Sequence, residues 1–133
     1  MSLNEDSKPY YSPSEIATLL IDCGYRGKLE QLESGRHIIR SATSGYKFAI
    51  YLYTPKDEPD HVTTMQFTSS FTEKYSLERV NKWNADRRFV KAYCDGDGDL
   101  CLEWDVVVQY VAPAYFKECF EFWDVLLGKL NEI

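Results

Sequence analysis

Apolar residues recur at helical spacing in three separate stretches of the chain. The first stretch, roughly residues 13–23, follows a Ser12-x-x-Glu15 pattern that is typical of a capping box at the start of a helix. Gly24 comes directly after it and suits the left-handed conformation that ends many helices. The spacing therefore predicts an amphipathic helix with a defined beginning and end.

The other two helical stretches lie in the second half of the chain. Ser76 can cap a short helix, which we expect to face inward through Leu77, Val80 and Trp83 (or Asn84). The last and longest helix begins near Ala112 and has a wide apolar stripe, formed by Tyr115, Phe116, Cys119, Phe120, Trp123, Leu126, Leu127 and Leu130. Phe122 lies at the edge of this stripe and Val125 falls outside it.

Alternating apolar and polar residues between turn signals predict strands in the remaining segments. Four strands are expected at residues 29–32, 37–42, 46–54 and 62–71. In the third, Phe48, Ile50 and Leu52 share one side, whereas Tyr51 and Tyr53 lie on the other. The second side of a half-buried strand usually carries charge, so we expect this aromatic side to be partly covered, for example by another subunit.

Residues 89–108 read as a β-hairpin. If Asp97-Gly98 forms a two-residue type I′ turn, Cys94 faces Cys101 and Tyr93 faces Leu102. One face then collects the expected core residues Phe89, Tyr93, Leu100, Leu102, Trp104 and Val106. The opposite face carries Val90, Ala92, both cysteines, Glu103 and Asp105.

The predicted order of elements is α-β-β-β-β-α-β-β-α. Because neighbouring strands are joined by short connections, we expect an α+β fold with an antiparallel sheet of about six strands and three helices gathered on it. Residues 1–11 are predicted to be a disordered or loosely docked tail. Residues 12–133 are predicted to be one domain, a length that a single core serves well.

Net charge argues against two classes of partner. At −6, the chain repels phosphate backbones and anionic lipid, so we expect neither nucleic acid nor a membrane surface as partner. The N-terminal residues are polar and acidic rather than signal-like, which favours a cytoplasmic protein.

No catalytic, metal or cofactor site is predicted. DGDGD at residues 95–99 suggests calcium, but an EF-hand counted from Asp95 needs Gly and Glu where Leu100 and Val106 stand, so a turn is favoured. The cysteines at 23, 94, 101 and 119 form no CxxC pair, and thiols persist in a reducing cytoplasm. A pair of a cysteine or serine with His37 or His61 stays open, although no nucleophile motif accompanies either histidine.

A surplus of aromatic residues is the remaining signal. Tyr51, Tyr53, Phe122 and Val125 fall outside the predicted core faces and form the candidate protein interface. Scattered surface exposure is an equally good explanation, because single apolar residues are common on protein surfaces.

Several segments, in order, resemble the YbjN family of bacterial proteins, which are described as sensory transduction regulators. These are ATSGYKFAIYLYT, TTMQFTSSF and LERVNKWNADRRFVKAYCDGDGDLCLEWDV, with Trp83, Asn84, Phe89, Ala92 and Tyr93 among the matching residues. Val90 departs from the small residue expected there. The resemblance implies a fold similar to the dimeric chaperones of type III secretion and a regulatory or protein-binding role without catalytic residues.

Three hypotheses follow, and no protein partner can be named from the sequence. The leading one is a non-enzymatic bacterial regulatory or protein-interaction module that forms a homodimer. The second is a chaperone of the type III secretion kind that binds a protein client. The third is an enzyme that uses a cysteine and a histidine.

Overall fold

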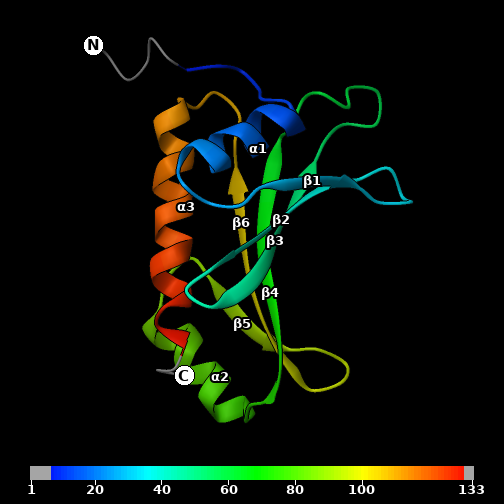
Figure 1. Cartoon of the computed structure of the whole chain (residues 1–133). Coiled ribbons are helices and arrows are strands. Elements are labelled where there is room, and N and C mark those ends of the chain that lie inside the picture. The colour runs from blue at the N-terminus through cyan, green and yellow to red at the C-terminus, as the bar shows by residue number, and fades with distance from the viewer. Residues whose placement is uncertain (1–6, 131–133) are drawn as a thin grey trace.

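The structure, a computed structural model, describes residues 7–130 and confirms the predicted order of elements. Within this range three helices and six strands follow one another as α-β-β-β-β-α-β-β-α (Figure 1). The helices are α1 (Pro13–Asp22), α2 (Leu77–Asp86) and α3 (Pro113–Leu127). The strands are β1 (Lys28–Gln31), β2 (His37–Thr43), β3 (Tyr46–Tyr53), β4 (Thr64–Lys74), β5 (Lys91–Cys94) and β6 (Asp99–Val107).

The strands form one antiparallel sheet in the order β1-β2-β3-β4-β6-β5, which confirms the α+β class. Because β6 pairs with β4, the short strand β5 lies at the edge of the sheet. Figure 1 shows α3 running along the sheet, with α1 near one end of it and α2 near the other end, beside β5.

The core lies between the helices and the face of the sheet that carries alternate apolar residues. Trp123 of α3 is fully buried, and its ring centroid lies 5.3 Å from that of Phe67 and 5.9 Å from that of Phe48. Trp104 of β6 is half-buried, stacks on Phe67 at 5.3 Å and lies 5.0 Å from the ring of Phe122 of α3. Such ring contacts add to the burial of apolar area, so both tryptophans hold α3 to the sheet.

A polar contact also fixes α3 against the turn between β2 and β3. The carboxylate of Asp124 accepts hydrogen bonds from Tyr25 (2.9 Å), Thr43 (2.5 Å) and Ser44 (3.0 Å). Burial raises the pKa of Asp124, but the bonds donated by Thr43, Tyr25 and Ser44 lower it by more, so the pKa lies below its ordinary value. The ionised carboxylate is therefore the form that the fold stabilises.

The predicted signals at the helix ends are largely present. The Ser12–Glu15 capping box forms, and Gly24 adopts φ +93° after α1. Ser76 caps α2 by accepting a hydrogen bond from the backbone N–H of Arg79 at 3.2 Å. Leu77, however, is 76% exposed, contrary to the prediction, because α2 turns Val80 and Trp83 inward while its first residue stays outside the core.

Residues 8–11, which belong to the predicted tail, run along the fold, whereas residues 1–6 of that tail lie outside the described residues. Lys8 pairs with Val111, and Tyr11 pairs with Val62. The Tyr11 side chain is buried, and its hydroxyl donates a hydrogen bond to the carbonyl of Val111 at 2.7 Å. Tyr11 is therefore part of the core.

The β5–β6 hairpin is shifted by one residue from the predicted pairing. The backbone N–H of Asp95 donates to the carbonyl of Asp99 (2.9 Å), and that of Gly98 donates to the carbonyl of Asp95 (2.9 Å). The turn thus spans residues 96–98, with Gly98 at φ +82°, instead of the predicted two-residue turn. Tyr93 now pairs with Cys101, so the predicted Cys94–Cys101 pairing is wrong.

This shift exchanges the two faces of the segment that leads into β5. Side chains alternate along a strand, so moving the pairing by one residue turns every side chain over. Phe89 and Tyr93, predicted inside, are 63% and 37% exposed, and Val90 and Ala92, predicted outside, are buried. On β6 the prediction was correct for Leu100, Leu102 and Val106, which are buried, while Trp104 is half-buried.

Candidate protein-binding site

The tight connection between α2 and β5 places a phenylalanine on the outside of the protein. Trp83 at the end of α2 and Val90 before β5 are both buried, and the indole N–H of Trp83 donates to the carbonyl of Val90 at 3.4 Å. Between them the chain reverses at Phe89, which has φ +73°. A positive φ is an outlier for a bulky residue, so Phe89 is held outward at a cost in backbone energy.

Asn84 fixes the strand that follows this reversal. Its side-chain carbonyl accepts a hydrogen bond from the backbone N–H of Ala92 (2.8 Å), and its NH₂ group donates to the backbone carbonyl of Ala92 (2.9 Å). One side chain thereby satisfies both backbone groups of Ala92 on the outer edge of β5. Two contacts therefore fix the segment that carries Phe89: Trp83 with Val90, and Asn84 with Ala92.

The exposed ring of Phe89 belongs to a cluster that we call the Phe89 surface. It packs edge-on against Phe122 of α3, with 5.6 Å between ring centroids, and lies 6.4 Å from Trp104. Phe122 and Trp104 are 5.0 Å apart. Val125, one helical turn after Phe122, is 60% exposed beside them. These four residues form an apolar surface where α2, β5, β6 and α3 meet.

A hollow of about 300 Å³ adjoins this surface and has a mainly basic border. Phe89, Phe122, Val125 and the aliphatic Leu126 supply apolar lining, and the charged residues around them are Asp86, Arg87, Arg88 and Lys129. The guanidinium of Arg88 lies 5.0 Å from the ring centroid of Phe89, and that of Arg87 lies 4.6 Å from the ring of Trp83. The cations therefore stand directly beside the aromatic rings.

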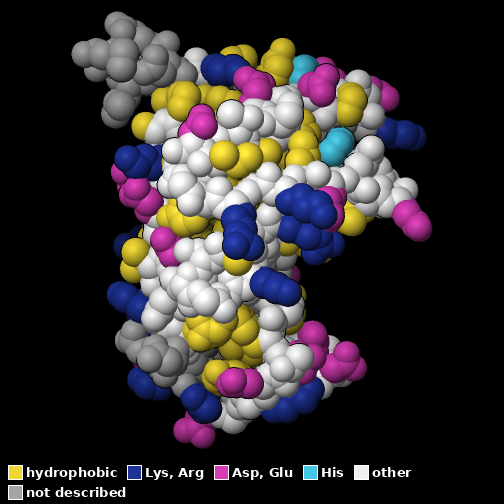
Figure 2. All heavy atoms as spheres, viewed as in Figure 1, with side chains coloured by type: hydrophobic (Ala, Val, Ile, Leu, Met, Phe, Trp, Pro, Cys, Tyr) yellow, Lys and Arg dark blue, Asp and Glu magenta, His cyan; other side chains and the backbone are white. Residues whose placement is uncertain are grey.

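The structure does not bring the four predicted interface residues together. Phe122 and Val125 lie in the Phe89 surface, on the helical side of the sheet. Tyr51 and Tyr53 alternate with the buried Ile50 and Leu52, so they lie on the opposite side of the sheet, where both are half-buried. Figure 2 shows Lys and Arg side chains gathered over β2 and β3, and Arg36 lies over the ring of Tyr53 at 4.4 Å.

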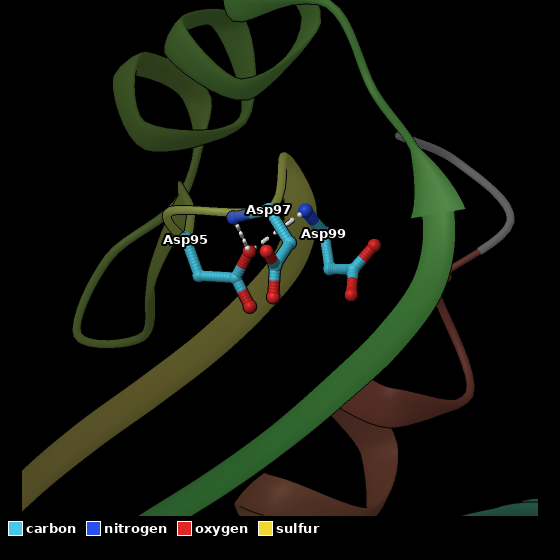
Figure 3. Close-up of side chains that lie close together, drawn as sticks. All are labelled: Asp95, Asp97 and Asp99. Atoms are coloured by element: carbon cyan, nitrogen blue, oxygen red, sulfur yellow. Dashed lines mark hydrogen bonds between the residues drawn. The ribbon is translucent and has the colours of Figure 1, made fainter.

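The DGDGD segment acts as a turn in which the carboxylates of Asp95 and Asp99 are already engaged. Oxygen atoms of Asp95, Asp97 and Asp99 lie within 4.8 Å of one another. Figure 3 shows one oxygen of Asp95 accepting the backbone N–H groups of both Asp97 (2.9 Å) and Asp99 (3.0 Å). The ammonium group of Lys74 bonds the Asp99 carboxylate and the Asp97 carbonyl. This cluster therefore organises the hairpin.

The cysteines and histidines are dispersed across the fold. Burial raises the pKa of the Cys119 thiol to about 11 and also raises that of Cys23, which keeps both thiols protonated near neutral pH. His61 stacks on Tyr10 at 3.5 Å and pairs with Glu58 at 3.1 Å. Among residues 7–130 no hydrogen bond joins a histidine to a cysteine, so this part of the chain contains no Cys–His dyad.

Fold and surface together define a small α+β protein with an exposed aromatic cluster at the edge of its sheet. The family model named YbjN, described as "Putative bacterial sensory transduction regulator", matches residues 12–124, and the chain belongs to this family. Comparison with curated proteins gives no significant match. No helix within residues 7–130 has both the length and the apolar character that a membrane span requires.

The residues that carried the resemblance in the sequence prove to have a structural role. Trp83, Asn84 and Ala92 make the contact between α2 and β5 that is described above. The sequence missed Phe89 as a surface residue because its apolar character predicts burial. No signal in the local sequence indicates a left-handed backbone at a phenylalanine.

Proposed function

We propose that this protein is a non-enzymatic bacterial regulator that acts by binding another protein through the Phe89 surface. The observation that carries the proposal is Phe89 itself, which is 63% exposed and has φ +73° while it packs on Phe122 and Trp104. An exposed aromatic ring is unfavourable in water, and a positive φ is unfavourable for the backbone of a phenylalanine. Neither feature helps the chain to fold, so both point to a role in binding. Backbone strain of this kind clusters at functional sites.

Two further features support binding rather than catalysis. Protein-interface hot spots are rich in aromatic residues and arginine, and the Phe89 surface combines aromatic rings with Arg87 and Arg88 in the hollow beside it. The cysteines described here are free thiols, and two of them have a raised pKa, which disfavours a nucleophilic role and suits a cytoplasmic location. The family description as a sensory transduction regulator agrees with this proposal.

A comparison of three forms of the chain tests the proposal. Affinity capture from the native bacterium is run with the wild type, with Phe89→Asn/Val125→Ser and with Leu77→Ser. Leu77 is 76% exposed at the first residue of α2, so its variant controls for the loss of exposed apolar area elsewhere. We expect a protein that the wild type and Leu77→Ser retain and the double variant loses. Equal retention by all three forms would contradict the proposal.

We also propose that the chain is a homodimer that associates through the side of the sheet carrying Tyr51 and Tyr53. These half-buried aromatics lie opposite the Phe89 surface, so a dimer formed there leaves that surface accessible. Size-exclusion chromatography with light scattering should give about twice the chain mass of 15.5 kDa. A Tyr51→Glu variant should shift the mass to that of one chain, and a wild-type monomer at high concentration would overturn the proposal.

A further inference from the structure

We infer that the occupant of the Phe89 surface is an acidic, amphipathic segment of the partner protein. This inference rests on the proposed function and specifies the chemistry of what binds. Two properties of the surface lead to it, namely the hollow between α2 and α3 and the sign of the charge around that hollow.

The apolar part of the surface is shaped to receive side chains. The hollow measures about 300 Å³ and lies between the end of α2 and the outer side of α3. Phe122 and Val125 lie three residues apart on one face of α3, and Lys129, just after the C-cap Gly128, lines the same hollow beyond them. A segment lying along this face can insert apolar side chains at similar spacing into the hollow, in the manner of a helix in a groove.

Positive charge dominates the border of the hollow. Three of its charged residues, Arg87, Arg88 and Lys129, are cations, and Asp86 is the one carboxylate. Asp86 is already paired with Lys82 at 2.8 Å, whereas Arg88 and Lys129 form no ion pair within residues 7–130. The chain as a whole carries −6, so this border is a local reversal of sign. Complementary charge favours an acidic partner.

Two other occupants fit the charges less well. In a symmetric dimer through this surface the same patch would meet itself. Among the described residues that line the hollow, the only carboxylate that it could offer to Arg88 and Lys129 is Asp86, which is already paired with Lys82. An anionic membrane would be repelled by the protein's net charge of −6, and the cations around the hollow are too few to offset this repulsion. Glu118, one turn before Phe122, is negatively charged, so the positive charge lies at the other end of this surface, near Lys129. The acidic end of the bound segment should therefore lie there.

Selection from a displayed library of random peptides, about 15 residues or four helical turns long, tests the inference. Peptides are selected on the wild type and counter-selected on Phe89→Asn/Val125→Ser. We expect the retained peptides to combine apolar residues at helical spacing with net negative charge. On Arg88→Glu/Lys129→Glu their affinity should fall about tenfold, the effect of losing two partly screened charge pairs. Leu77→Ser should bind them like the wild type.

The possible outcomes separate the inference from the function on which it rests. Surface-dependent peptides that are neutral or basic would overturn the acidic partner but leave protein binding through the Phe89 surface intact. Failure to obtain any surface-dependent peptide would count against both. Vesicles of phosphatidylglycerol and phosphatidylcholine serve as the second probe. Binding to them that requires Arg88 and Lys129, without an acidic peptide class, would replace the proposal with a lipid surface.

Discussion

The side-chain amide of Asn84 pairs with both backbone groups of Ala92, at 2.8 Å and 2.9 Å. In this way Asn84 of α2 bonds one residue at the edge of β5 as a neighbouring strand would. An open strand edge is a template for pairing with other chains, so Asn84 both holds α2 in place and protects the edge. The geometry of the Phe89 surface depends on this contact, because Phe89 lies between the two residues.

Replacing Asn84 should therefore affect both stability and self-association. Asn84→Ala removes two hydrogen bonds to the edge strand and should lower the free energy of unfolding by roughly 1–3 kcal/mol. Urea denaturation measures this loss, and light scattering on the folded protein should detect added association through the bared edge. Asn84→Asp keeps the acceptor but places a carboxylate against the carbonyl of Ala92, so it should not rescue stability. Unchanged stability in both variants would contradict this role.

Phe89 offers the opposite test, since its substitution should relieve strain. Asparagine tolerates the left-handed backbone, so Phe89→Asn should leave the free energy of unfolding unchanged or raise it by about 1 kcal/mol, while binding is lost. Phe122→Ala removes a ring of the same cluster from a regular helix and should lower stability instead. Thermal and urea denaturation of the two variants provide the comparison. A Phe89→Asn variant as destabilised as Phe122→Ala would show that the strain is unimportant.

Asp124 should give the protein a pH-dependent stability in acid. Because its pKa is lower in the folded state than the ordinary value of 3.8, the unfolded chain takes up protons first as pH falls. The stabilisation is complete above that value and is lost as pH drops through the lower, folded-state pKa. Asp124→Asn should cost roughly 1–3 kcal/mol at neutral pH and progressively less in acid. Urea denaturation across this range checks the trend, with the exposed Glu118→Gln as the control on the same helix.

The turn between β5 and β6 can be tested with two neighbouring glycines. Gly98 has φ +82°, so Gly98→Ala should lower the free energy of unfolding by about 1 kcal/mol. Gly96 has neither a positive φ nor any atom within 4 Å of an added Cβ, and Gly96→Ala should have little effect. Equal effects of the two substitutions on urea denaturation would argue against the three-residue turn.

The sequence predicted the order of elements well because each has strong local signals. The Ser12–Glu15 capping box and the alternation in β3 are satisfied by nearby residues alone. The pairing of β5 with β6 was not predictable in the same way, since Asp97-Gly98 suits a two-residue turn and the side chain of Asp95 selects a three-residue turn instead. The length of this turn decides which residues of β5 and of the segment before it face the core.

The candidate site was only partly predictable for the same reason. Phe122 and Val125 could be found from the sequence because they lie at the edge of the apolar stripe of the last helix or outside it. Both belong to the Phe89 surface. Phe89 and the basic border could not be found in this way, because they depend on how α2 docks on β5. The docking residue Asn84 is a polar side chain near a helix end, and nothing in its sequence context specifies that its partner is Ala92.

Tyr11 has a consequence for how the protein is made. Its hydroxyl bonds the carbonyl of Val111, a residue 100 positions later. On the ribosome, the segment around Tyr11 cannot dock until the chain has been made as far as Val111. We expect the nascent protein to acquire its final protection against proteases near Tyr11 only after Val111 has emerged, which pulse-labelled translation followed by limited digestion can follow.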